Sequence, residues 1–201
     1  MKIGIYGGSF NPIHNGHLHL AREARRQMNL DEVWLMVSPH NPLKKSSSLL
    51  RDELRLELVR IATQNEEGLS ASDFEFSLQR PSFTWNTLQA LSLQHPEHQF
   101  SLLVGADNWS VFHKWYAYEK ILLFYPIIIY PRRNSEVDES NLPHGVTLLQ
   151  TELIDISSTE VRRRVAYGLP IDHLVPECVA EKVAEYYSNQ KRKTLPEEEE
   201  L

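Results

Sequence analysis

The amino-acid sequence predicts an α/β protein with a mostly parallel sheet, helices on both faces of the sheet and a small C-terminal helical portion. Two observations lead to this prediction. Short apolar runs alternate with segments whose apolar residues recur every three or four positions, and only helical patterns follow the last run. Strands and helices that alternate form parallel sheets with right-handed crossovers and helices on both faces. This is the Rossmann-like class, which binds ligands at the carboxyl ends of its strands.

Six runs have the length and residue types of strands. The first leads into a glycine-containing loop, the third alternates between apolar and polar residues, and the fourth is compact and ends at Gly105. The predicted strands are 2–6, 33–37, 69–76, 100–104, 127–130 and 146–150.

The segments between these strands have helical periodicity. Leu18, Ala21 and Ala24 fall on one side of a helix after the first strand. A later helix is expected to begin with Ser82 as its N-cap and to end before Pro96. The remaining segments expected to be helical are marked by Leu54, Leu58, Ile61 and Ala62, and by the stretch WSVFHKWYAYEKILLF.

The C-terminal part is predicted to be helical as well. Ser157 and Glu160 have the spacing of a capping box, Gly168 suits a helix C-terminus and Pro176 suits the start of the next helix. The charged end of the chain has no apolar periodicity. We expect one domain over 1–187, its helical portion over about 156–187, and a disordered tail over 188–201.

Composition limits the possible functions. The chain has 201 residues, 41% of them hydrophobic, and a formal charge of −6, which argues against a long nucleic acid as partner but allows a small phosphate ligand. No apolar run reaches the roughly 20 residues that cross a bilayer. Glycines interrupt the first apolar stretch, so no signal peptide is expected, and the single cysteine, Cys178, cannot form an intrachain disulfide. We expect a cytoplasmic protein without membrane contact.

The stretch KIGIYGGSFNPIHNGHLHL joins the first strand to the first helix. Gly7 and Gly8 allow a ligand to approach the backbone, and the following helix offers free N–H groups to an anion. Asn15 is the expected helix cap, so His14 and His17 flank the helix entrance and are able to donate to a phosphate. A tight turn with two surface histidines is the alternative. Zinc is weaker, because the helix supplies no evident third ligand.

GGSFNPIHNGHL resembles the G-x-F-x-P-x-H-x-G-H signature of the nucleotidyltransferase superfamily of adenylyl- and cytidylyltransferases. SPHNPLK, PSFTWNTL, GADNW, HKW and DISSTEVRRR follow in the order found in bacterial nicotinate-nucleotide adenylyltransferases. The resemblance covers the chain from its first residue to about Tyr187. It implies a nucleotidyltransferase domain that joins ATP and nicotinic acid mononucleotide to form deamido-NAD and pyrophosphate, a step of NAD biosynthesis.

The resemblance also implies the roles of individual residues. His14, His17 and Arg162 are the expected catalytic residues. The residues expected to bind ATP are Gly8, Ser9, Phe10, His14, His17, Gly105, Asp107, Ile156, Ser157, Ser158 and Arg162. Those expected to bind nicotinic acid mononucleotide are Ser9, Phe10, Lys44, Thr84 and Trp115.

Several of these roles have a direct chemical reason. Asp107 follows a buried strand, where its carboxylate is able to accept from ribose hydroxyls or to cap a helix. Trp115 offers a stacking surface for the pyridine ring. Lys44 suits a phosphate, although the neighbouring Lys45 suits it equally well and His40 is a weaker candidate.

Other aromatic and basic residues near these motifs are expected to have structural or solvent-facing roles. Trp85 and Trp109 are expected in the core, and position 85 departs from the small or aliphatic residue familiar in the family. Arg162, Arg163 and Arg164 point about 100° apart on a helix, so they cannot all face one ligand. The resemblance selects Arg162.

The implied reaction needs no general base, because the attacking phosphate is already ionised at neutral pH. Alignment and neutralisation of charge then carry catalysis. Mg²⁺ is expected to arrive on the ATP phosphates, so no protein metal site is predicted. The oligomeric state is not readable from the sequence.

Three alternatives stay open. One is a sister enzyme such as pantetheine-phosphate adenylyltransferase, which would not call for Trp115. Another is an adenylyltransferase that prefers the nicotinamide form. The third is a silent nucleotide-binding regulator, which would be expected to lose a histidine or the terminal arginine motif, yet both are present.

Overall fold

The computed structural model describes residues 1–40, 49–152 and 154–194. Within these residues six strands form one sheet in the order β3-β2-β1-β4-β5-β6, and every neighbouring pair is parallel. The strands are β1 (Lys2–Gly8), β2 (Glu32–Val37), β3 (Leu69–Ser72), β4 (Gln99–Gly105), β5 (Ile127–Tyr130) and β6 (Val146–Leu148). The predicted Rossmann-like sheet is confirmed. The strand order reverses between β1 and β4, which places a crevice at their carboxyl ends.

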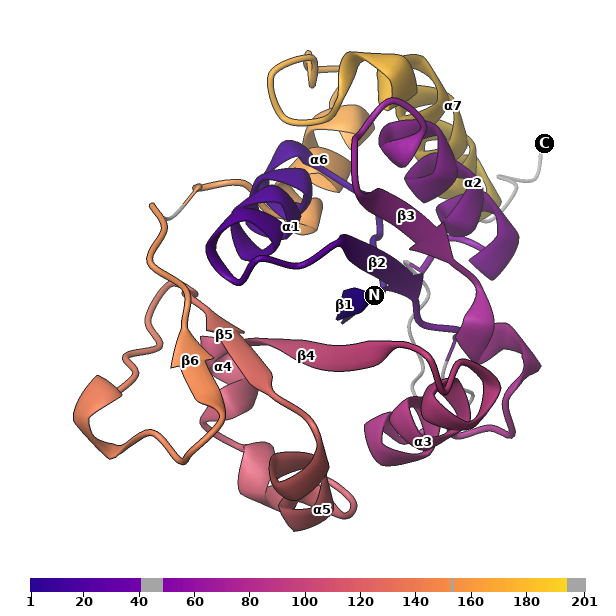
Figure 1. The fold of residues 1–201 in the computed structure, drawn as a ribbon. Helices are drawn as coiled ribbons and strands as arrows, with labels where there is room; N and C mark the ends of the chain where they lie inside the picture. Colours follow the sequence, from indigo (N-terminus) through magenta and orange to yellow (C-terminus); the bar gives the residue numbers. More distant parts are fainter. Residues whose placement is uncertain (41–48, 153, 195–201) are drawn as a thin grey trace, which may run out of the picture.

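Helices cover both faces of the sheet (Figure 1). Four helices, α1, α2, α6 and α7, lie on one side, and α3, α4 and α5 lie on the other. The helices are α1 (Asn15–Gln27), α2 (Asp52–Thr63), α3 (Thr84–Gln94), α4 (Ala106–Trp109), α5 (Tyr118–Phe124), α6 (Ser158–Ala166) and α7 (Glu177–Thr194). In the described ranges, no helix has the length and apolar character required to cross a membrane.

Two separate cores lie against the two faces of the sheet. β1 contributes to both, because successive side chains of a strand point to opposite faces. Ile3 and Ile5 pack into the core under α3 and α5, together with Leu88. Tyr6 packs into the other core, which α1, α2, α6 and α7 cover and to which Val179 belongs.

The third strand is shorter than predicted. β3 ends at Ser72, and Phe74–Ser77 forms a 3-10 turn instead of continuing the strand. β3 is an edge strand that pairs only with β2, and its last pair joins Met36 to Ser72. β2 itself ends one residue later, at Val37, so little of it remains for a longer β3 to pair with.

The stretch WSVFHKWYAYEKILLF does not form one helix. It is divided into the end of α4, a 3-10 turn at Phe112–Lys114 and α5. Trp115 is extended, and Ala117 has a left-handed φ of 55°. These conformations interrupt a right-handed helix. The interruption leaves Trp115 and Tyr116 on a loop beside the start of α3.

The N-cap of α1 is His14 and not Asn15, which is the first helical residue. Asn15 instead donates two hydrogen bonds to the segment before α7. Its backbone N–H donates to the Leu174 carbonyl at 2.8 Å, and its Nδ2 donates to the His173 carbonyl at 3.2 Å. Asn15 therefore ties the start of α1 to the segment that precedes α7.

The other helix ends agree only in part with the prediction. α3 begins after Phe83, so Ser82 lies one residue too early to cap it. At α6 the cap is confirmed, because the Ser157 hydroxyl accepts from the Glu160 N–H at 3.1 Å. Gly168 follows α6 with a φ of 66°, the conformation that favours glycine after a helix.

The boundary expected at residue 187 falls inside α7, which runs to Thr194. The sequence SNQKRKT contains no glycine or proline, so the helix is able to continue past residue 187. Glu57 anchors α7 to α2 by accepting from Lys182 and from the Tyr186 hydroxyl, both at 2.9 Å. The rest of the expected tail, 195–201, lies outside the described residues.

Candidate active site

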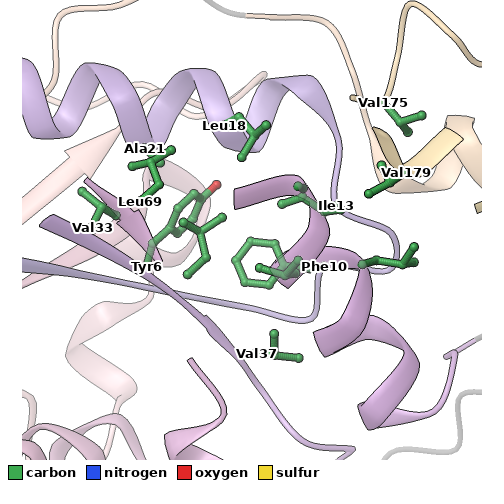
Figure 2. Close-up of a cluster of buried hydrophobic side chains, with 14 of the residues drawn as sticks. Tyr6, Phe10, Ile13, Leu18, Ala21, Val33, Val37, Leu69, Val175 and Val179 are labelled. Atoms are coloured by element: carbon green, nitrogen blue, oxygen red, sulfur yellow. The ribbon is translucent and has the colours of Figure 1, made fainter. Parts of the chain in front are cut away.

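The loop between β1 and α1 is held in place by its own apolar side chains. Phe10 and Ile13 are 2% and 0% exposed, and Figure 2 shows both pointing into the core that contains Leu18 and Val179. Phe10 has a φ of 42°, which is unusual for a residue with a side chain. The burial of these two side chains therefore fixes the loop.

Asn11 connects this loop to distant parts of the chain. Its side-chain Oδ1 accepts from the Leu50 N–H at 3.1 Å and from the Tyr187 hydroxyl at 2.6 Å. Its backbone carbonyl accepts from Arg162 Nη1 at 2.6 Å. The expected catalytic Arg162 is thus bonded to the loop backbone, and its Nη2 also donates to the Thr159 hydroxyl at 3.2 Å.

A fully buried arginine, Arg55 on α2, holds the same loop from beneath. Its guanidinium donates to the carbonyls of Ser9, Ser38 and Leu50 and forms an ion pair of 2.7 Å with Asp52. A buried guanidinium is stable only when its donors are satisfied in this way. Arg55 therefore fixes the loops that follow β1 and β2 relative to each other.

His14 and His17 form a stacked pair at the start of α1. Their ring centroids are 3.6 Å apart and their planes are inclined by 22°. The backbone N–H of His14 donates to Nδ1 of His17 at 3.2 Å, so in the neutral imidazole the proton of His17 sits on Nε2. Nδ1 of His14 is buried and has no hydrogen-bond partner among the described residues.

Both imidazoles are neutral at pH 7. Burial, together with the positive charge of Arg132, lowers the pKa of His14 to about 3. Burial also lowers the pKa of His17 well below its ordinary value, with His14 and Arg132 as smaller causes. A neutral imidazole is still able to donate one hydrogen bond, and an incoming phosphate would favour protonation of either ring.

The stacked histidines open onto a cavity of about 230 Å³ at the carboxyl ends of the strands. Residues from four places in the chain meet in its wall: the start of α1, the ends of β4 and β5, and the segment that leads into α6. They include His14, His17, Asp107, Arg132, Ile156 and Ser157. The cavity combines cationic and neutral donors with the N-terminus of α6, a combination suited to phosphates.

Arg132 and Arg133 both bring positive charge to the wall of this cavity, and Arg133 is paired with Asp155. Arg132 follows β5, and its guanidinium carbon lies 5.1 Å from the centre of the Tyr130 ring. Its Nε is buried and has no hydrogen-bond partner among the described residues, although it lies 3.9 Å from Asp107 Oδ1. The exposed part of this guanidinium lies at the cavity wall, where it is well placed to bind an anion.

Asp107 lies in the first turn of α4, directly after β4. The N-cap of α4 is Gly105, so the Asp107 side chain does not cap this helix. A Cβ at position 105 would lie 2.4 Å from Asp107 Oδ1. Glycine is therefore required there for the carboxylate to keep its place in the cavity wall.

A second cavity of about 260 Å³ is lined by Trp115, Thr84 and Lys114, among others. The Trp115 ring packs on Phe112, with ring centroids 5.0 Å apart, so one side of the indole is supported by the core. Thr84 also borders a neighbouring cavity of about 200 Å³, whose wall includes Glu75. Burial raises the pKa of the Glu75 carboxyl.

The sequence model of one family, described as cytidylyltransferase-like, matches residues 5–164, which include both histidines and Arg162. The chain belongs to the cytidylyltransferase-like family. This agrees with the resemblance of GGSFNPIHNGHL to the superfamily signature.

Within this family, the chain is similar to several proteins that carry a more specific name. A probable nicotinate-nucleotide adenylyltransferase of Bacteroides fragilis is 44% identical over 182 residues, 90% of each chain. The protein of the same name in Bacteroides thetaiotaomicron is 44% identical over 186 residues, 92% of each chain. The fold is shared with the Plasmodium falciparum nicotinic acid mononucleotide adenylyltransferase complexed with NaAD, at a TM-score of 0.72 and 21% identity, over 92% of this chain and 98% of that one.

The structure groups some of the residues predicted for this cytidylyltransferase-like protein and separates others. His14, His17, Asp107, Ile156 and Ser157 meet around the first cavity, whereas Thr84 and Trp115 meet at the second. The predicted residues that line neither are Gly8, Ser9, Phe10, Gly105, Ser158 and Arg162. Phe10 is a core residue, and the Ser158 hydroxyl donates to the Pro12 carbonyl at 2.9 Å. Lys44 and Lys45 lie outside the described residues.

The positions of Arg132 and Arg55 were not predicted from the sequence. Arg132 stands in the stretch YPRR after β5, and an arginine at the carboxyl end of a predicted strand is a signal that was available. Arg55 offered no such signal, because a helical arginine is usually exposed. The core position expected for Trp85 is confirmed, because this side chain is 7% exposed. Trp109 is only partly buried and packs against the same core by stacking on Phe112.

Proposed function

We propose that this protein is a nicotinate-nucleotide adenylyltransferase, which transfers the adenylyl group of ATP to nicotinic acid mononucleotide. The products are deamido-NAD and pyrophosphate, and the reaction belongs to NAD biosynthesis. The observation that carries this proposal is 44% identity, over nine-tenths of the chain, to relatives of that name. The phosphate-binding character of the first cavity and the aromatic surface of the second agree with it.

The two cavities suggest a place for each substrate. ATP would lie in the first, with its phosphates at His14, His17 and Arg132 and its ribose at Asp107. The mononucleotide would place its pyridine ring on Trp115. The support for this arrangement is the chemistry of the walls: donors and positive charge in one cavity, and an indole beside the N-terminus of α3 in the other.

The chemistry follows from these positions. An oxygen of the mononucleotide phosphate forms a bond with the α-phosphorus of ATP, while the bond from that phosphorus to the α,β-bridging oxygen breaks. Pyrophosphate leaves with the electron pair. The attacking phosphate needs no base, so the protein aligns the two phosphates and neutralises charge with the histidine N–H groups and the Arg132 guanidinium.

Mg²⁺ would enter on the ATP phosphates, where it retains water ligands. The wall of the first cavity carries carboxylates such as Glu152 beside its cations, so a hydrated ion fits there without a dedicated protein cage. We further propose that the enzyme works in the cytoplasm and that nucleic acids are not its partners, in line with its acidic charge.

The test is pyrophosphate release with ATP, Mg²⁺ and either nicotinic acid mononucleotide or its amide form. We expect turnover with both substrates present and a higher rate with the acid. Equal rates would contradict acid preference but leave adenylyl transfer intact. ATP binding without turnover on either form would favour a silent nucleotide-binding regulator, and turnover with phosphopantetheine alone would indicate the sister enzyme.

A further inference from the structure

The sequence His-Pro-Glu-His lies between α3 and β4, at the amino end of β4 and therefore at the edge of the sheet opposite the two substrate cavities. His95, Glu97 and His98 each offer a ligand atom, and these atoms lie within 4.8 Å of one another. In the described part of the chain no other group of three His, Cys, Asp or Glu side chains meets this condition. The adenylyl transfer proposed above uses none of the three residues.

The two imidazoles face the same carboxylate oxygen. Nε2 of His98 lies 3.3 Å and Nδ1 of His95 lies 3.8 Å from Oε1 of Glu97. Ligands at tetrahedral positions about 2.1 Å from an ion are about 3.4 Å apart. Small rotations of side chains would therefore bring all three atoms to coordinating distance.

The backbone around this turn is held at both ends. The His95 N–H closes the last turn of α3 on the Leu91 carbonyl at 2.8 Å, and the His98 N–H donates to the His95 carbonyl at 3.0 Å. The next residue, Gln99, begins β4 and donates to the Met1 carbonyl at 2.8 Å. The ligand positions are thus fixed by the fold before any ion binds.

The side chains are also oriented. The rings of His95 and His98 are stacked, with centroids 5.5 Å apart and planes inclined by 4°, and the Trp34 indole packs edge-on against both. Nδ1 of His98 is buried, so Nε2 is the nitrogen that an ion can reach. The Glu97 side chain is 61% exposed and leaves the site open to solvent.

We propose that His95, Glu97 and His98 form a binding site for one divalent transition-metal ion, with water completing the coordination. Two imidazoles and one carboxylate suit Zn²⁺, Ni²⁺ or Co²⁺, whereas Mg²⁺ and Ca²⁺ prefer oxygen ligands alone. The ion would join the end of α3 to the start of β4 and so stabilise the folded chain. It is distinct from the Mg²⁺ that accompanies ATP.

Calorimetric titration of ZnCl₂ into the untagged, metal-free full chain tests this proposal. We expect one equivalent to bind, and the double variant His95→Asn, His98→Asn to lose that equivalent, with affinity reduced about 100-fold or more. His144→Asn, at an exposed histidine elsewhere, is the matched control and should bind as the wild type does. Zinc bound by His14 and His17 would survive in the double variant. An isotherm that the double substitution leaves unchanged, or no binding by the wild type, overturns the proposal.

Trp34 provides a second readout that does not depend on the double variant folding. Ni²⁺ bound beside both imidazoles should quench Trp34 fluorescence, and Glu97→Gln should shift the quenching to about tenfold higher Ni²⁺. Trp34→Phe should abolish this quenching while calorimetry still detects binding. Zn²⁺ should raise the melting temperature of the wild type by several degrees. Pyrophosphate release by the His95/His98 double variant should match the wild type, whether or not the proposed acid preference holds. Quenching that persists in Trp34→Phe would refute this location.

Discussion

The imidazole rings of His14 and His17 stack at 3.6 Å, and the His14 backbone N–H holds Nδ1 of His17 as an acceptor. The hydrogen bond from the His14 N–H to Nδ1 decides which nitrogen of His17 carries the proton. With Nδ1 occupied, Nε2 is the remaining nitrogen able to donate to a ligand. His17 is therefore held as an oriented donor, with the His14 ring stacked against it.

Replacing His17 by Ala should lower turnover about 100-fold or more, because it removes an oriented donor to the transferring phosphate. Pyrophosphate release at saturating ATP is the measurement, with circular dichroism to confirm the fold. His19→Ala is the control on the same helix, since the His19 imidazole bonds to the Thr151 hydroxyl at 2.8 Å and does not line the cavity. Near-normal turnover of His17→Ala would show that the phosphates bind elsewhere.

Replacing Arg132 by Met should reduce kcat/KM for ATP at least about tenfold, because the wall of the first cavity loses a positive charge. Arg132→Lys should recover part of this loss, since the charge returns without the planar fork. Arg163→Met is the matched control, because that guanidinium is exposed and paired with Glu160 at 2.8 Å. Equal effects of the two methionine variants would contradict a role for Arg132 in binding ATP.

Folding stability should fall as the pH is lowered from 6.5 toward 3. In that range the unfolded chain protonates His14, whose ordinary pKa is 6.5, but the folded chain does not until about pH 3. At pH 4.5 the difference corresponds to about 2–3 kcal/mol from His14, with His17 acting in the same direction. Urea denaturation at pH 7.0 and 4.5 measures it. His14→Asn should lose less stability than the wild type between these pH values, and parallel losses would refute the mechanism.

Gly105→Ala should weaken ATP binding more than it weakens the fold. The added Cβ would lie 2.4 Å from Asp107 Oδ1 and 3.1 Å from the Tyr130 ring, so the carboxylate must move out of the cavity wall. The backbone φ of −69° at Gly105 suits alanine, which limits the loss of stability. We expect a raised KM for ATP, similar to that of Asp107→Ala. An unchanged KM in both variants would exclude Asp107 as a ribose acceptor.

Arg55→Met should destabilise the fold by about 3–5 kcal/mol, because Asp52 and three loop carbonyls lose their buried partner. The midpoint of urea denaturation gives this difference. Arg60→Met on the same helix is the control: its ion pair with Asp73 is exposed and should contribute less than about 1 kcal/mol. A loss below 1 kcal/mol for Arg55→Met would mean that the loops do not depend on this guanidinium.

The sequence by itself determined the alternation of strands and helices, the parallel sheet and the histidine loop. These features follow from local patterns, because an apolar side chain must reach a core whatever the rest of the chain does. The strand 127–130 was predicted to the residue for this reason. The length of β3 and the break before α5 were not, since edge pairing and the left-handed Ala117 depend on neighbours in space.

Only the tertiary structure decided which residues share a cavity. Arg132 reaches the histidines because β5 lies two strands from β1, a relationship set by the order of the sheet and not by distance in sequence. Arg162, which the resemblance assigns to ATP, donates to the backbone carbonyl of Asn11 in the histidine loop. Sequence motifs identify the chemistry of a site. The partners of a charged side chain are decided by the contacts that the folded chain makes.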